Sequence, residues 1–153
     1  MPDGEYVYIE LPGEAGKEGK CGRLRKWLYG MRNAASAWEK HYSDTLAEMG
    51  FAKSKVAPTV FYNAEKKVRC VVLGDDFTFS GRLNVLRQIA ERMREVYELK
   101  VRGILGDEPD DDKEITILNR TLRWTTEGLE YKADDRHVRE IVNYFEFRED
   151  SRG

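Results

Sequence analysis

Cysteine, histidine and long apolar runs are all scarce in this sequence, and each scarcity argues against a class of protein. The two cysteines, Cys21 and Cys70, form no CxxC pair and have no histidine at ligand spacing, so neither a disulfide framework nor a zinc site is expected. No apolar run approaches the ~20 residues of a membrane span, and the first residues lack the features of a secretion signal. We therefore expect an intracellular protein, cytoplasmic or nuclear, that is not secreted and has no membrane partner.

Net charge is also small, at −2, but the charges are unevenly distributed. Residues 17–40 carry seven basic and two acidic side chains, whereas residues 101–150 carry eight basic and fourteen acidic ones. A polyanion such as a nucleic acid would therefore be attracted to the N-terminal third. With 41% apolar and 35% charged residues, the chain has the composition of a globular protein, and its 153 residues predict a single domain over 1–153.

Apolar periodicity predicts an alternation of strands and helices. Helices are expected over 32–49 and 83–97 and from 134 or 135 onward, with Gly50 ending the first. Strands are expected over 5–10, 59–62, 68–73, 77–80, 115–124 and 129–132, with loops at 13–22, 63–66 and 103–112. The inner face of the last helix is assigned to Val138, Ile141, Val142 and Phe145, and Trp124 is assigned to the core. This order predicts an α+β fold, an antiparallel sheet with helices packed on one face.

The stretch VVLGDDFTFS, residues 71–80, places the adjacent carboxylates Asp75 and Asp76 between two apolar segments. An Asp-Asp dipeptide on its own is typical of a solvated hairpin turn. Carboxylates are also the ligands that Mg²⁺ prefers, together with phosphate oxygens, and in two-metal phosphoryl transfer the ions lie ~3.5–4 Å apart. The apolar flanks favour a position at the rim of a buried hairpin, so a solvated turn and a site for Mg²⁺ (or Mn²⁺) both stay open.

A second stretch, WLYGMRNAASAW at residues 27–38, combines a glycine, a base and the start of a helix. Gly30 is expected where the backbone approaches a partner closely, Arg32 adds positive charge, and free N–H groups at a helix N-terminus attract phosphate. Aromatic and basic side chains around it form a mixture typical of contacts with a nucleic acid strand: Arg23, Arg25, Lys26, Trp27, Tyr29 and Trp38. The alternative is a core helix with Trp38 buried and Arg32 merely solvated.

Together these stretches resemble the reverse transcriptase of copia-type long-terminal-repeat retrotransposons. In that family L-Y-G-L-K-Q-A-P-x-x-W opens a helix, and Y-V-D-D follows about forty residues later in an apolar hairpin; the counterparts here are residues 28–38 and 73–76. Further segments agree in order with family motifs: 6–9 with 12–13, 50–51 with 58–61, 97–100 with 117–118, and the helix from Asp134. The resemblance covers nearly the whole chain.

This resemblance implies a polymerase palm that adds deoxynucleotides to a primer 3′-hydroxyl under the direction of a template. Asp75 and Asp76 would be the catalytic, metal-binding pair, with Mg²⁺ or Mn²⁺ as the cofactor. Tyr29, Gly30, Arg32 and Asn33 would lie near the incoming nucleotide or the template, and Arg23, Arg25 and Lys26 near the nucleic-acid backbone. Implied partners are an RNA or DNA template-primer, deoxynucleotides and the remaining parts of a polyprotein.

Departures from the family pattern are expected to limit activity. The family's third catalytic carboxylate lies in an upstream L-D-V strand that we expect outside these residues, as are the fingers, most of the thumb and ribonuclease H. Leu73 replaces the tyrosine of Y-V-D-D, Asn33 a glutamine, Ala35 a proline, and Asn119 the glycine of F-L-G. We therefore expect an incomplete palm domain that does not polymerise alone, a fragment of a longer protein or a decayed remnant.

Two other functions remain open at this point. One is a non-catalytic, retrotransposon-derived domain that binds a nucleic acid or a protein. The other is a nucleotide cyclase of the diguanylate type, whose hairpin carries G-G-D-E-F. Residues 73–77, LGDDF, echo that motif but lack the glutamate, and such a cyclase has no role for residues 27–38.

Overall fold

The computed structural model describes residues 6–15, 19–132 and 135–145. The chain forms two compact units, Met1–Glu91 and Arg92–Gly153. The expectation of one domain over 1–153 stays a prediction, because a division into compact units does not decide whether each folds independently.

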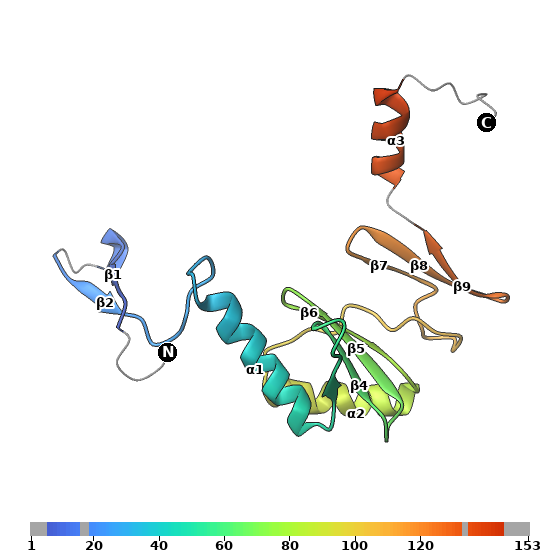
Figure 1. Ribbon diagram of the computed structural model, residues 1–153, viewed down its shortest axis with the longest axis horizontal. Coiled ribbons are helices and arrows are strands. Elements are labelled where there is room, and N and C mark those ends of the chain that lie inside the picture. Colours follow the sequence, from blue (N-terminus) through green and yellow to red (C-terminus); the bar gives the residue numbers. More distant parts are fainter. Residues whose placement is uncertain (1–5, 16–18, 133–134, 146–153) are drawn as a thin grey trace. The chain divides into compact units, whose positions relative to one another are not determined.

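The described residues form helices and antiparallel sheets (Figure 1). In order along the chain the elements are β1 (Tyr8–Glu10), the short 3₁₀ helix η1 (Gly13–Ala15), β2 (Cys21–Arg23), α1 (Ala34–Glu48), β3 (Ala52–Lys53), β4 (Val60–Asn63), β5 (Val68–Leu73), β6 (Asp76–Ser80), α2 (Leu83–Arg94), β7 (Glu114–Ile117), β8 (Arg120–Thr125), β9 (Gly128–Lys132) and α3 (Asp135–Tyr144). The predicted α+β class is confirmed. The strands form three sheets, β1-β2, β3-β4-β5-β6 and β7-β8-β9, rather than the single sheet expected.

The four-stranded sheet carries the core of the first unit on one of its faces. In β5, Val68, Cys70 and Val72 are buried, whereas Arg69 and Leu73 are exposed. Because successive side chains of a strand point to opposite faces, this alternation shows that one face is covered and the other is open. Helix α1 packs on the covered face, since the ring of Tyr42 lies 6.0 Å from that of Phe61 and 6.2 Å from that of Phe77; in α2, Ile89 is buried.

Helix α1 ends as the sequence predicts. Gly50 has φ 84°, and its N–H donates to Ala47 O while that of Phe51 donates to Leu46 O, both at 2.9 Å. This pair of bonds is the Schellman motif, which satisfies carbonyl groups that the helix leaves without a partner. It returns the chain directly into β3, a two-residue strand that the sequence pattern did not predict.

Helix α1 lies along β5 and is attached near both ends. Asn63, where β4 turns into β5, donates to Met49 O at 3.0 Å. At the other end of β5, Trp38 bonds to the backbone of Gly74. The lengths agree: residues 38–49 rise about 16 Å as a helix, and residues 68–73 extend about 16 Å as a strand. The N-terminus of α1 therefore lies at the end of the sheet where β5 turns into β6.

The second unit contains a three-stranded sheet instead of the predicted strand pair. The strand expected over 115–124 is interrupted by Leu118 and Asn119, which have φ of 49° and 61° and form the two-residue loop between β7 and β8. Asparagine tolerates this left-handed conformation, but leucine rarely adopts it. Because Leu118 is apolar and stands within an apolar segment, no turn was predicted at this position.

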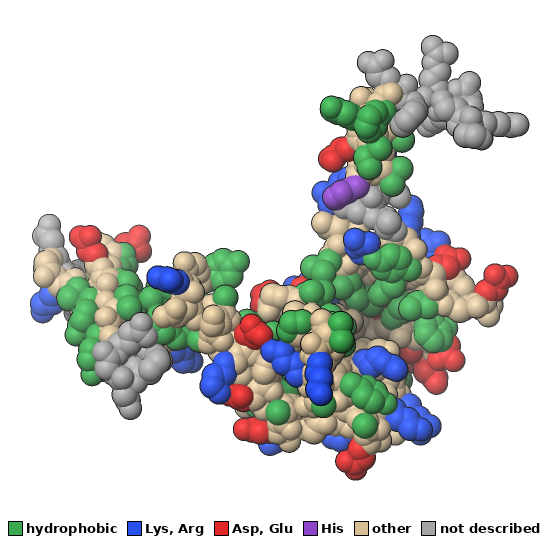
Figure 2. All heavy atoms as spheres, in the orientation of Figure 1, with side chains coloured by type: hydrophobic (Ala, Val, Ile, Leu, Met, Phe, Trp, Pro, Cys, Tyr) green, Lys and Arg blue, Asp and Glu red, His purple; other side chains and the backbone are tan. Residues whose placement is uncertain are grey.

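Two assignments of core residues in the second unit are wrong. Trp124 is 40% exposed, and the expected inner face of α3 is open, with Val138 and Ile141 each 56% and Phe145 60% exposed. Figure 2 shows hydrophobic side chains at the surface of α3. Amphipathic spacing thus predicted the helix correctly without predicting a partner for its apolar face.

The N-terminal hairpin β1-β2 shows that the loop predicted over 13–22 ends earlier than expected. Cys21 and Gly22, expected within a loop, belong to β2, which pairs with β1 in the register Glu10↔Cys21 and Ile9↔Gly22.

Both cysteines are free, Cys21 exposed and Cys70 buried. Among the described residues, the helices are all too short or too polar to cross a membrane.

Candidate functional site

The acid pair lies at the turn between β5 and β6. Leu73 pairs with Asp76, so Gly74 and Asp75 form a two-residue loop and Asp76 is the first residue of β6. Gly74 has φ 63°, which suits the glycine at the first loop position of a type II′ hairpin turn. Asp75 is exposed and Asp76 is half-buried. The expected hairpin is therefore present, and its tip is one residue shorter than Gly74-Asp75-Asp76.

The two faces of β6 differ in chemistry. The ring of Phe77 lies 6.1 Å from that of Trp38 and 6.2 Å from that of Tyr42, both on α1, so it belongs to the helix-covered face. Since side chains alternate along a strand, Asp76 and Thr78 belong to the opposite face. A ligand of Asp76 would approach the face of the sheet opposite α1.

A side-chain hydrogen bond joins the two stretches that the sequence pattern selected. Trp38 Nε1 on α1 donates to the backbone oxygen of Gly74 at 2.8 Å. The sequence left Trp38 open between nucleic-acid contact and burial in a core helix; it is half-buried and its ring contacts Tyr42 and Phe77, which favours packing. No sequence signal predicted its donor role, because the acceptor is a backbone atom 36 residues away.

The predicted nucleotide-binding residues lie at the same end of the sheet as the acid pair. Trp38 is four residues after Ala34, the first residue of α1, so the helix begins about 6 Å along its axis from Trp38. Tyr29, Gly30, Arg32 and Asn33 occupy the turns just before it and are exposed. Gly30 has φ 88° and no described atom within 4 Å of where a Cβ would lie, so within the described chain its positive φ, rather than close packing, requires glycine.

The predicted backbone-binding residues belong to a different element. Arg23 is at the end of β2, with its guanidinium 5.2 Å from the ring centre of Tyr6, while Arg25 and Lys26 are exposed in the segment that follows. No ion pair within the described part of the chain links these three side chains to Asp75 or Asp76. The hairpin bases therefore form a separate basic surface, whereas the first turns of α1 are joined to the acid turn by the bond of Trp38.

The acid turn carries donor groups of the kind that bind divalent cations. Within residues 6–15, 19–132 and 135–145, no group of three or more Asp, Glu, His or Cys side chains is placed to hold an ion. Two neighbouring carboxylates fit the way Mg²⁺ is commonly held, by one or two carboxylates with phosphate oxygens and water completing the shell. The pair thus has suitable donor chemistry, and an ion held there would need further ligands from other molecules or from other residues.

The acidic loop at residues 107–112, after α2, differs from the turn that carries Asp75 and Asp76. Its carboxylates are used within the loop, since Asp112 Oδ2 accepts from Ile104 N at 3.0 Å and Asp111 Oδ2 from Glu108 N at 3.3 Å. The ammonium group of Lys113 lies 3.0 Å from Gly106 O and 2.7 Å from Glu108 O. The ammonium group of Lys113 therefore supplies positive charge beside these carboxylates.

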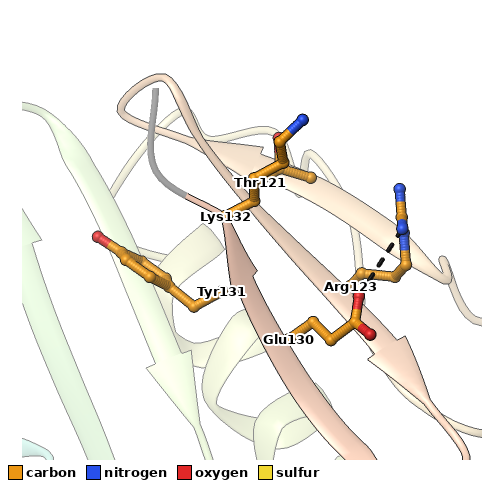
Figure 3. Close-up of a pocket in the computed structure, with 5 residues that line it drawn as sticks. All are labelled: Thr121, Arg123, Glu130, Tyr131 and Lys132. Carbon is orange, nitrogen blue, oxygen red and sulfur yellow. Dashed lines mark ion pairs between the residues drawn. The ribbon is translucent and has the colours of Figure 1, made fainter. Parts of the chain in front are cut away.

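A recess of about 300 Å³ lies on the β8–β9 pair of the second unit (Figure 3) and is lined by Thr121, Arg123, Glu130, Tyr131 and Lys132. Arg123 is held between two carboxylates, 2.7 Å from Glu114 and 3.7 Å from Glu130. The hydrogen bond and the charge of Glu114 raise the pKa of Arg123. None of the predicted site residues lines the recess, so the sequence patterns and this hollow identify different places.

Residues 4–107 match the family described as reverse transcriptase (RNA-dependent DNA polymerase). Two Saccharomyces cerevisiae proteins, the Transposon Ty1-DR4 and Transposon TyH3 Gag-Pol polyproteins, are each 27% identical to the chain over 121 residues, which is 78% of this chain. The chain spans 7% of the length of these relatives. No solved structure matches it. The chain therefore belongs to the reverse transcriptase (RNA-dependent DNA polymerase) family, as a reverse transcriptase region of a copia-type retrotransposon.

Proposed function

We propose that the first unit is the palm portion of a polymerase and that its acid turn binds the divalent ions used in nucleotidyl transfer. The observation that carries this proposal is the position of Asp75 and Asp76, at the tip of a hairpin whose turn accepts a hydrogen bond from α1. The antiparallel sheet, with α1 on one face and Asp76 on the other, supports it. Template and primer would approach the open face.

Asp75 and Asp76 would hold Mg²⁺ or Mn²⁺. When bound, the metal supplies charge stabilisation for the transferring phosphoryl group. The chain's own contribution is to present two adjacent carboxylates on a short loop, one exposed and one at the start of β6. A rigid turn reduces the conformational entropy that ion binding would otherwise cost.

The segment before α1 would bind the phosphates of a nucleotide or template. The first turn of α1 contains no acidic side chain. The N-terminus of a helix favours anions, and Arg32 adds a permanent positive charge. Arg23, Arg25 and Lys26 would contact the nucleic-acid backbone through the hairpin surface.

Polymerisation would require more than the described residues. Two-metal chemistry needs carboxylates from more than one strand, and no third acidic ligand accompanies the pair in the described ranges. We propose that the complete polyprotein supplies the missing parts and that this chain alone does not extend a primer. In that complete protein, the partners would be a template-primer and deoxynucleotides.

A calorimetric titration of Mn²⁺, alone and with inorganic pyrophosphate, tests the metal proposal. Wild type should bind Mn²⁺, and pyrophosphate should strengthen binding because phosphate oxygens complete the shell. Asp75→Asn and Asp76→Asn should each weaken it. Asp110→Asn, in the acidic loop, is the matched control and should leave it unchanged.

Indistinguishable isotherms for wild type and Asp75→Asn would end the metal proposal. If such a protein still bound a primer–template duplex, a non-catalytic nucleic-acid-binding domain would be the better assignment. Failure to bind either ligand would leave binding of another protein as the function to examine.

A further inference from the structure

We propose that Trp38 is a positioning residue for the metal site, with its indole N–H fixing the turn that presents Asp75 and Asp76. The inference deepens the proposed function and rests on it for its consequence, although the mechanical part can be tested without metal. It starts from the 2.8 Å bond between Trp38 Nε1 and Gly74 O.

The donor is packed against other rings. Three rings lie beside the half-buried indole, with centroids 5.7 Å away at Tyr42 and 6.1 Å away at both His41 and Phe77. The rings of Tyr42 and Phe77 meet it edge to face, an arrangement that aromatic pairs favour. Helix α1 is also bonded to Asn63 at its far end. The indole therefore belongs to a packed cluster rather than to a mobile surface side chain.

The acceptor, in contrast, has little packing of its own. Gly74 has φ 63°, and no described atom lies within 4 Å of the position that a Cβ would take. Glycine has the largest backbone freedom of any residue, so a glycine in an open loop can take several orientations. A hydrogen bond from a rigid donor restricts that freedom.

Fixing this carbonyl also restricts the backbone that carries the next carboxylate. The oxygen of Gly74 and the nitrogen of Asp75 belong to one planar peptide unit. When the indole holds the oxygen, it sets the plane of that unit and hence the direction in which the chain enters Asp75. Asp76 is already held by its pairing with Leu73. The distance between the two carboxylates would thus be restricted from both sides.

The carbonyl is also polarised by the bond. A carbonyl that accepts a hydrogen bond makes the N–H of the same peptide unit a better donor. That N–H belongs to Asp75. The indole therefore affects both the geometry and the hydrogen-bonding strength of the loop, and it does so without touching the metal or the substrate itself.

The test compares wild type with Trp38→Phe, which keeps a ring for Tyr42 and Phe77 and removes the N–H donor. Tyr42→Phe is the matched control, because it changes a polar atom in the same aromatic cluster and leaves the indole in place. Two quantities are measured on the full chain: backbone ¹⁵N relaxation of Gly74 and Asp75 without metal, and Mn²⁺ affinity by calorimetry. Thermal unfolding of each variant reports general damage.

We expect Trp38→Phe to increase the mobility of Gly74 and Asp75 and to weaken Mn²⁺ binding roughly two- to tenfold, the effect of losing one hydrogen bond. Tyr42→Phe should change neither quantity. Loss of thermal stability with unchanged turn mobility and unchanged Mn²⁺ affinity would show that Trp38 is only a packing residue and would overturn the inference.

The two proposals can fail separately. If wild type does not bind Mn²⁺, the proposed metal site is wrong, and the relaxation data alone decide whether Trp38 holds the turn. If Trp38→Phe does not fold, the solvent exchange of the indole N–H in wild type decides instead. Slow exchange supports the bond, and exchange as fast as that of an exposed indole contradicts it.

Discussion

The amide of Asn63 donates a 3.0 Å hydrogen bond to the carbonyl oxygen of Met49, and it ties the end of α1 to the turn that leads into β5. Asn63 is only 2% exposed, and its Oδ1 accepts a second bond from Lys66 N at 2.9 Å. With the bond of Trp38 at the other end of β5, this contact sets the position of α1 along the sheet.

Asn63→Ala should lower the free energy of unfolding by about 1–3 kcal/mol, because a carbonyl and an N–H group lose their partners in a partly buried place. Chemical denaturation followed by circular dichroism measures this. Glu65→Ala, an exposed change in the same turn, should have little effect. Equal stability of both variants would contradict the anchoring role of Asn63.

The two cysteines should differ sharply in reactivity. The thiolate is the reactive form, and burial raises the pKa of the Cys70 thiol to about 12. A thiol reagent at pH 8 should therefore modify exposed Cys21 at once and Cys70 only when the protein unfolds. Cys21→Ser should lack the fast phase. Rapid modification of both thiols in the native protein would contradict the burial of Cys70.

The same pKa shift predicts a loss of stability in alkaline solution. The shift runs from 9.0 to about 12, so between these values the unfolded chain loses the Cys70 proton while the folded chain keeps it. The contribution of the Cys70 thiol to the free energy of unfolding is therefore fully present below pH 9 and is lost as the pH rises toward 12. Cys70→Ala should show a weaker decline when unfolding is measured at pH 8 and pH 10.

The loop between β7 and β8 contains a residue poorly suited to its conformation. Leu118 has φ 49°, while asparagine is favoured at this position of a two-residue turn. Leu118→Asn should stabilise the hairpin by about 1 kcal/mol, seen as roughly fivefold slower hydrogen exchange of β7 and β8 amides. Thr126→Asn, in the next turn, should not slow exchange. Unchanged exchange in Leu118→Asn would show that leucine causes no strain.

The basic side chains within residues 17–40, on the hairpin and before α1, predict binding of a primer–template duplex that depends on salt. A protein that neutralises phosphates loses affinity with a log–log slope near −0.9 for each phosphate. Arg25→Glu combined with Arg32→Glu should weaken binding to all sequences alike and make the slope less steep by about 2. Lys66→Glu, an exposed reversal in the turn after β4, is the matched control. Binding that is insensitive to salt or to the double reversal would exclude these basic side chains as the binding site.

Sequence patterns predicted the parts of this fold that local chemistry determines. Alternation marked β4, β5 and β6, the glycine at position 50 marked the end of α1, and the acid pair appeared at a hairpin turn as expected. These features depend on a few neighbouring residues, so periodicity and turn preferences are enough to find them.

What could not be predicted depends on partners distant in the sequence. The bond between Trp38 and Gly74 needs a backbone acceptor 36 residues away, and the break at Leu118 follows from pairing that overrides residue preference. The exposed face of α3 shows the converse: spacing indicates which side of a helix is apolar but not what covers it.

Paramagnetic broadening of backbone amide signals by Mn²⁺ tests the central claim most directly, because it locates the ion on the chain. The account predicts that signals of residues 73–77 and of the Trp38 indole N–H weaken first, and that Asp75→Asn removes the effect. Broadening centred on the acidic loop at residues 107–112, or spread evenly over exposed carboxylates, would contradict it.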